Sequence, residues 1–558
     1  MPILKYKKEG LILMNEGLTP KLISCLKGYS KDKLTGDIVA GIVVAIIALP
    51  LSIALAIASG VTPEQGLYTA ITAGFVIALL GGSNVQISGP TAAFATIVAG
   101  IVAKNGMDGL ITATILAGII LILMGIFRFG KLIKFIPFTI TTGFTTGIAL
   151  TLVIGQLKDF FGLTYTHAPI ETMEKLKEAI LCFNTINLEA VLIGAIALLI
   201  LIVWPKIKGA NKIPPSLIAV IICAAIVKIF DMNVNTIGSL YEIKAGLPAF
   251  SVPVFSFDTV RTVLPDAFTI AILAAIESLL SCVVSDAMIG AKHNSNAELI
   301  GQGAGNIASA LFGGIPATGA IARTAANVKN GGRTPVSAMV HAVVLLLVLV
   351  VLMPYAKLIP MPVIAAILFV VAYNMSEWRE FVYLVKSSPK SDVLVLLLTF
   401  ILTVVFDLVV AIGVGMVLCA VLFMSRMAEV TDVSGWKYLE DGDDDTLRDV
   451  PKGVFVYEIN GPLFFGASDK IANMYIYKNA KAVIVRMGSV PSLDATAVHK
   501  LEQFVKKCEK KNVRVIFSHV NEQPMKTMQK SGLYDEIGKE NFALNIDEAL
   551  KKAEEIVR

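Results

Sequence analysis

Two short glycine-containing segments carry the residues best suited to bind an anion. The first runs Ser88-Gly89-Pro90-Thr91-Ala92 within a stretch that has no charged side chain. Proline is favoured in the first turn of a helix, so a helix is predicted to begin here inside an apolar region. A helix N-terminus attracts anions through free N–H groups and a partial positive charge. We therefore predict that Ser88, Gly89, Thr91 and Ala92 bind an anion.

The second segment, Thr318-Gly319-Ala320-Ile321-Ala322-Arg323, repeats this pattern. Another short helix is predicted to begin near Gly319, with Arg323 one turn inside it. Arginine at membrane depth is costly, which favours a functional role. The predicted binding residues here are Gly319, Ala320, Ile321, Ala322 and Arg323. The alternative is that both segments serve only close helix packing.

Glu277 is the only ionisable residue between Asp266 and Asp286. A carboxyl group in an apolar environment binds a proton more readily than in water, so Glu277 is predicted to exchange a proton. With Ser281, one helical turn away, it could instead bind Na⁺. The remaining alternative is a structural carboxyl group, either protonated or paired with Arg323.

The other chemical motifs favour structure over catalysis. The six cysteines form no CxxC pair, and the histidines lack the spacing of metal ligands. The glycine-rich run 301–305 lacks the preceding strand of a nucleotide-binding loop, and there is no Walker motif. His341 is predicted to be a hydrogen-bonded core residue. We therefore predict no metal site, no cofactor and no enzymatic activity.

Membrane-spanning helices are the elements expected to position these residues. Of 558 residues, 55% are hydrophobic and 16% are charged, and the mean hydropathy is +0.73. This composition excludes a disordered chain, a nucleic-acid-binding protein and a secreted disulfide scaffold. A span needs about 20 apolar residues. The uncharged runs predict about fourteen membrane segments between residues 37 and 428, so the lipid bilayer is the expected surrounding.

An internal repeat divides this region, with a second half from about residue 265. Residues 81–93 resemble residues 313–320, and residues 130–137 resemble 356–360. Seven segments separate the copies, and an odd number inverts the second copy in the membrane. Inverted repeats with short, glycine- or proline-interrupted segments are typical of secondary transporters. Chance similarity between Gly/Ala-rich helices is the alternative.

The positive charges predict the orientation. Short loops after even-numbered segments hold many lysines and arginines, as does the segment 1–36, whereas the loops 158–189 and 228–266 hold acids as often as lysines. The positive-inside rule then places both termini in the cytoplasm and the protein in the inner (plasma) membrane.

Composition changes after Arg426. An acidic linker is predicted at 429–452 and a cytoplasmic α/β domain at 453–558. Strands are predicted at 454–459, 482–485 and 513–517, because these runs are rich in β-branched and aromatic residues, and helices at 494–509 and 546–557.

These motifs together resemble those of the sulfate permease (SulP) family. The resemblance rests on Leu49-Pro50, Gly66-Leu67-Tyr68, Ser88-Gly89-Pro90-Thr91, Glu277, and Gly313-Gly314 before Thr318-Gly319. It implies a seven-plus-seven inverted repeat in which a core domain moves against a gate domain like an elevator. It also implies a homodimer that transports small anions.

Within the family, phrases such as Ala275-Ile276-Glu277-Ser278 and Ala320-Ile321-Ala322-Arg323 resemble the DauA-type C4-dicarboxylate branch. This likeness implies proton-coupled uptake of succinate and fumarate. A proton is favoured over Na⁺ because Ile321 stands where sodium-bicarbonate members have a hydroxyl residue. Sulfate, bicarbonate or chloride transport remains the alternative, as does an anion channel or sensor that signals through the C-terminal domain.

The C-terminal domain resembles STAS domains. Thr496 falls on the regulatory phosphorylation site of related domains, although the usual following glycine is Ala497. Packing or capping of the helix by Thr496 is the favoured interpretation, and phosphorylation is the alternative. Asp494 fits an N-cap equally well. A cytoplasmic protein partner is a further expectation for this domain.

Overall fold

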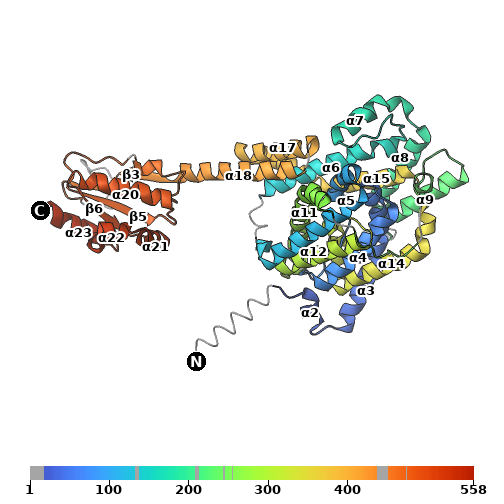
Figure 1. Cartoon of the computed structure of the whole chain (residues 1–558), viewed down its shortest axis with the longest axis horizontal. Helices are drawn as coiled ribbons and strands as arrows, with labels where there is room; N and C mark the ends of the chain where they lie inside the picture. The colour runs from blue at the N-terminus through green and yellow to red at the C-terminus, as the bar shows by residue number, and fades with distance from the viewer. Residues whose placement is uncertain are drawn as a thin grey trace. The chain divides into compact units, whose positions relative to one another are not determined.

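The computed structural model describes residues 18–131, 137–207, 213–242, 246–253, 256–406, 408–435, 450–472 and 474–558. The chain forms two compact units, Met1–Met416 and Val417–Arg558 (Figure 1). Parts of the predicted N-terminal segment, of the 130–137 repeat motif and of the acidic linker lie outside the described residues.

The first unit is entirely helical apart from one short two-stranded ribbon, within the described part of the chain. Its first half contains α3 (Lys31–Ala58), α4 (Pro63–Leu80), α5 (Ala92–Ile126), α6 (Phe138–Phe161), α8 (Leu188–Val203) and α9 (Pro215–Ile229). Its second half contains α11 (Phe257–Ile289), α12 (Ser295–Leu311), α13 (Ile321–Lys329), α14 (Val336–Ala356), α15 (Met361–Met375) and α17 (Lys390–Val405). α18 (Leu408–Val430) begins in this unit and continues into the second. Shorter helices connect them: α2 (Lys21–Leu26), α7 (Thr172–Leu181), α10 (Ile237–Leu240) and α16 (Trp378–Ser387).

The predicted membrane segments each have a helical counterpart when the two arms of α5 are counted separately. Gly106 divides these arms with a φ of +67°, a conformation that glycine adopts without steric cost. Seven helices among the described residues are long and apolar enough to cross a membrane by length and composition. Others, such as α13, are too short to span it alone, as expected for helices that begin inside the membrane.

Contacts between helices confirm the internal repeat. α12 packs on α5 in the same way that α4 packs on α14, and the pair α11–α5 matches the pair α3–α14. The pair α15–α8 likewise matches α6–α17. Each contact between a helix of the first half and one of the second therefore has an equivalent contact in which the two halves have changed roles. The helices fall into one group of α3–α5 and α11–α14 and a second group that includes α6, α8, α9, α15 and α17.

Glycines allow these helices to approach closely. A Cβ atom on Gly66 of α4 would lie 2.1 Å from the Ser52 carbonyl oxygen of α3. One on Gly303 of α12 would lie 2.4 Å from the Gly118 carbonyl oxygen of α5. The glycine-rich run 301–305 is thus a packing surface, as predicted.

The second unit contains a five-stranded sheet with the order β3-β4-β5-β6-β7. Its strands are β3 (Asp432–Gly435), β4 (Val454–Asn460), β5 (Ala482–Ser489), β6 (Arg514–Ser518) and β7 (Phe542–Ala543), all parallel except β3. Its helices are α19 (Asp469–Ala472), α20 (Ala495–Glu509), α21 (Glu522–Ser531), α22 (Leu533–Ile537) and α23 (Ile546–Val557). The three predicted strands and two predicted helices are confirmed.

Alternation of side chains along these strands builds two apolar layers. Val483 and Val485 of β5 contribute to one layer, with α20, and Ala482 and Ile484 to the other, with α23. One element differs from the sequence expectation: β3 lies inside the segment predicted to be a linker. It pairs antiparallel with β4. The backbone groups of β4 on this side therefore have hydrogen-bond partners, although β3 is polar.

Candidate functional site: an anion site between two helix N-termini

A two-residue antiparallel ribbon joins the two halves of the membrane unit. β1 (Ser88–Gly89) pairs with β2 (Thr318–Gly319), with Ser88 opposite Gly319. The Ala320 N–H extends the ribbon by donating to the Ile87 carbonyl at 2.9 Å. The two predicted anion-binding segments are therefore neighbours in space.

A helix begins immediately after each strand of the ribbon. α5 starts at Ala92 with Thr91 at its N-cap, and α13 starts at Ile321 with Ala320 at its N-cap. Both starts lie two residues later than the sequence suggested, because Pro90 and Gly319 have extended neighbours in the ribbon. The free N–H groups of both first turns thus surround the end of the ribbon, which is an arrangement that favours an anion.

Glu277 and Arg323 contact adjacent residues of the first segment. The Thr91 hydroxyl donates to Glu277 Oε2 at 3.0 Å. The Arg323 guanidinium donates through Nη2 to the Pro90 carbonyl. No ion pair joins the two side chains among the described residues, so the alternative in which Glu277 pairs with Arg323 is not supported. Residues 90 and 91 lie between them and supply a partner to each.

Burial separates the predicted residues into two groups. Ser88, Gly89, Ala92 and Gly319 are buried, and Arg323 is only 3% exposed. Thr91, Ala320 and Glu277 are half-buried, Ala322 is exposed, and Ile321 is 43% exposed. The accessible face of the site is therefore formed by the helix starts and the Glu277 carboxylate, while the ribbon forms its buried floor.

One nitrogen of Arg323 is available at this floor. Arg323 Nη1 is buried and has no hydrogen-bond partner in the described structure. A Cβ atom on Gly89 would lie 2.9 Å from this nitrogen, so glycine at position 89 is what allows the guanidinium to approach. A buried guanidinium N–H without a partner is unfavourable, and an anionic oxygen would satisfy it.

Glu298, which was not among the predicted site residues, anchors the segment before the ribbon. Its Oε2 accepts the Gly82 and Ser83 N–H groups at 2.8 and 3.1 Å. Its Oε1 accepts the amides of Gln86 and Gln302 at 2.6 and 2.8 Å. Charge-assisted bonds of this kind are about twice as strong as neutral ones. They fix the chain that leads into β1.

A row of polar side chains on α12 supplies this network. Glu298, Gln302 and Asn306 recur every four residues, so they share one face of the helix. Gln302 donates to the Ser88 hydroxyl at 3.2 Å, and Asn306 bonds to both the N–H and the carbonyl of Ala317. This four-residue spacing was the signal in the sequence that could have located the support of both strands.

Ser281 lies one helical turn from Glu277 on α11 and bonds to α13. Its hydroxyl donates to Thr324 Oγ1 at 3.3 Å, and Thr324 Oγ1 also accepts the Ile87 N–H at 3.0 Å. Ser281 therefore supports the ribbon. The pairing of Glu277 and Ser281 around Na⁺ stays a prediction.

His341 on α14 also differs from its expectation. It is fully buried, and neither ring nitrogen has a hydrogen-bond partner in the described residues. The prediction of a core residue is therefore confirmed, but the predicted hydrogen bond is absent among the described residues.

Thr496 in the second unit is exposed on the first turn of α20. Asp494 caps this helix instead: Oδ1 accepts the Ala497 N–H at 2.9 Å, and Oδ2 accepts the Phe465 N–H at 2.8 Å. Thr496 neither caps nor packs α20, contrary to the favoured interpretation, because Asp494 occupies the cap.

Two helix N-termini that converge on a ribbon between inverted halves define a secondary transporter for anions. Comparison with known proteins gives the family. Residues 34–399 match the sulfate permease family and residues 447–549 match the STAS domain. The chain belongs to the sulfate permease family and is a multi-pass membrane transporter, not an enzyme.

Several relatives are similar over nearly the whole chain. A Bacillus subtilis protein named "Putative sulfate transporter YvdB" is 41% identical, covering 94% of this chain and 98% of the relative. "Bicarbonate transporter BicA" of Picosynechococcus is 32% identical, covering 93% of this chain and 94% of the relative. The solved structure of SLC26A9 superposes with a TM-score of 0.87 at 20% identity, covering 98% and 94% of the two chains, which confirms the fold.

These similarities correct the subfamily expectation. The two bacterial relatives are named sulfate and bicarbonate transporters, and the likeness to the DauA-type dicarboxylate branch is not supported. The phrases that suggested that branch surround Glu277 and the start of α13. These positions form the support and the lining of the anion site.

Proposed function

We propose that this protein is a proton-coupled sulfate transporter. The observation that carries the proposal is the position of Glu277, whose carboxylate accepts a hydrogen bond from the N-cap residue of α5. A proton bound at this carboxylate changes the charge of the anion site itself.

The charges of the site match a divalent anion only when Glu277 is protonated. Each helix N-terminus contributes about half a positive charge, and Arg323 contributes a full one. With Glu277 protonated, the site carries about two positive charges, which balance sulfate. With Glu277 ionised, it carries about one. Proton and sulfate binding therefore favour each other, as cotransport requires.

Bicarbonate is the second candidate, favoured by the similarity to BicA. A monovalent anion balances the site with Glu277 ionised, so its binding would not require the proton. Succinate and fumarate, which the sequence alone favoured, carry their two charges on separate carboxylates and would need a second, separate positive pole. Arg323 is the full positive charge that the described site provides.

The test is uptake of labelled sulfate into proteoliposomes that contain the purified protein, with and without an inward proton gradient. We expect the gradient to stimulate uptake, and unlabelled sulfate to compete better than bicarbonate or succinate. In Glu277→Gln, which mimics the protonated carboxyl group, sulfate exchange should persist while stimulation by the gradient is lost.

The matched control is Asp159→Asn, which neutralises a half-buried carboxylate on α6, in the other helix group. This variant should keep the response to the gradient. Unaltered proton stimulation in Glu277→Gln would refute the role of Glu277. Competition by bicarbonate alone, without proton stimulation, would favour the second candidate, and current without saturable uptake would favour a channel.

Three further parts of the proposal rest on the charge bias and the family resemblance. Both termini face the cytoplasm, the helix group that holds the ribbon moves against the other group, and two copies form a homodimer. Labelling of a cysteine introduced at the C-terminus from each side of an oriented vesicle tests the orientation. Cross-linking in native membranes tests the dimer.

A further inference from the structure

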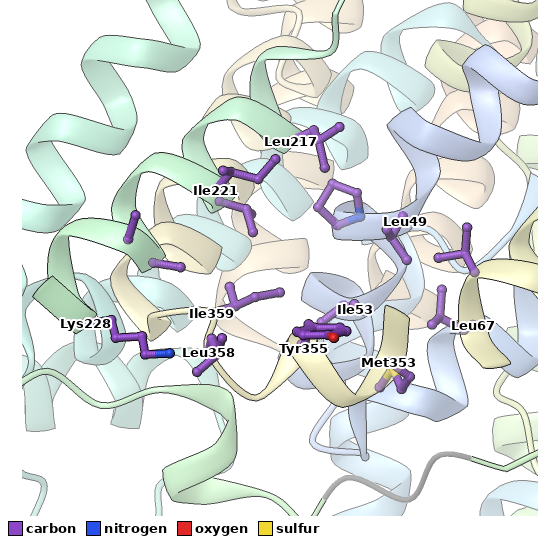
Figure 2. A pocket seen from close by; sticks show the side chains of 16 residues that line it. Leu49, Ile53, Leu67, Leu217, Ile221, Lys228, Met353, Tyr355, Leu358 and Ile359 are labelled. Carbon is purple, nitrogen blue, oxygen red and sulfur yellow. The ribbon is translucent and has the colours of Figure 1, made fainter. Parts of the chain in front are cut away.

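A cavity in the membrane unit is lined by none of the residues of the anion site. It has a volume of about 430 Å³, within the range of sites for small molecules. α3 and α4 form one wall, α9 forms the opposite wall, and the end of α14 with the following turn closes it (Figure 2). The cavity thus lies between a helix of one group and three helices of the other.

The lining of this cavity is apolar except at one end. Leu49, Ile53 and Leu67 face it from one wall, and Leu217 and Ile221 face it from α9. Lys228, at the other end of α9 from Leu217, is the only charged residue that lines it (Figure 2). In the described part of the chain, Lys228 has no ion pair and no side-chain hydrogen bond.

The dimensions of the α9 wall match one leaflet of a bilayer. The eleven-residue step from Leu217 to Lys228 rises about 16 Å along a helix, which is about half of a hydrocarbon core of roughly 30 Å. Lys228 is the penultimate residue of α9, and Tyr355 stands next to the end of α14. Lysine and tyrosine at helix ends are typical of the headgroup level.

The cavity borders an exposed apolar surface of the membrane unit. Ile221 and Tyr355 line it and are both more than half exposed. An exposed apolar surface of this kind in a membrane protein is expected to contact hydrocarbon. A lipid chain can therefore enter from the side, with its headgroup at the level of Lys228.

We propose that this cavity binds one acyl chain of an anionic phospholipid whose headgroup pairs with Lys228. The lysine supplies the charge that selects an anionic over a zwitterionic headgroup, and the apolar walls hold the chain. Because the walls belong to both helix groups, the bound lipid contacts α9 on one side and α3 and α4 on the other.

The test is photo-cross-linking of the full-length protein in vesicles that contain phosphatidylglycerol with a diazirine in its acyl chain. Phosphatidylcholine with the same chain serves as the headgroup control, and mass spectrometry locates the labelled peptides. We expect at least threefold more labelling of residues 217–228 and 348–359 by phosphatidylglycerol. Lys228→Gln should remove this preference without lowering the labelling by phosphatidylcholine.

Two further variants make the result specific. Ala224→Trp, which fills the cavity from α9, should lower labelling of these peptides by both lipids, whereas Lys206→Gln, a lysine outside the cavity, should change nothing. Equal labelling by the two lipids in the unmodified protein would overturn the proposal. So would labelling that Ala224→Trp leaves intact in a folded protein, or complete displacement of the lipid by an equal concentration of free palmitate.

Discussion

The replacement of Gly319 by alanine tests whether the ribbon is a rigid floor for the anion. A Cβ atom at position 319 would lie 2.3 Å from Gln86 Nε2 and 2.4 Å from its Cδ. Gln86 is 5% exposed and is held at both ends, by Glu298 at 2.6 Å and by the Cys282 thiol at 3.1 Å. The amide must therefore move and lose these bonds.

The magnitude follows from the bonds that break. A hydrogen bond to a charged group contributes about 1.5–3 kcal/mol, and the thiol bond adds roughly 0.5–1 kcal/mol. The expected loss is about 2–4 kcal/mol. Because 1.4 kcal/mol is tenfold, the affinity for the anion should fall roughly 30- to 700-fold if the strain is relieved at the ribbon. If the strain persists, the folded state is destabilised instead.

The assay is thermal unfolding of the purified protein over a titration of sulfate, which reports stability and affinity together. Gly155→Ala is the matched control, because a Cβ atom there would meet nothing within 4 Å in α6. That variant should be neutral or more stable by about 0.5–1 kcal/mol. A Gly319→Ala protein with unchanged melting temperature and unchanged sulfate response would refute the reasoning.

Three other predictions follow from single contacts. His341→Leu should raise stability by about 1–2 kcal/mol, because both ring nitrogens are buried without partners; a lower melting temperature would show that the ring has a partner. Bonds from Thr166 lower the pKa of Glu178 in α7 to about 2, so its stabilising effect is present above about pH 4.5 and is lost as the pH falls toward 2. The difference in melting temperature between the unmodified protein and Glu178→Gln should therefore shrink from pH 6 to pH 3, and a constant difference would contradict this. Asp494→Ala removes two hydrogen-bond acceptors and should lower the stability of the C-terminal unit by about 1–3 kcal/mol. Hydrogen exchange at the start of α20 should become faster. Equally faster exchange in Thr496→Ala would disprove the assignment of Asp494 as the cap.

The amino-acid sequence by itself determined the elements and their class. Uncharged runs predicted the membrane helices, because the bilayer excludes charge over a fixed thickness. Runs rich in β-branched and aromatic residues predicted β4, β5 and β6. The glycine- and proline-containing segments marked both helix starts within two residues, since irregular backbone at membrane depth needs a special sequence.

Only the tertiary structure decided which polar groups meet. Arg323 bonds the Pro90 carbonyl, 233 positions away, rather than Glu277. Glu298 holds the chain before β1, and the Ser281 hydroxyl bonds Thr324. Each of these side chains has several possible hydrogen-bond partners in the sequence. Which partner it meets depends on how closely the helices pack. Close contacts at glycines, such as that of Gly66 with Ser52, set this packing. The sequence shows where the glycines are, but it does not show which residue each of them contacts.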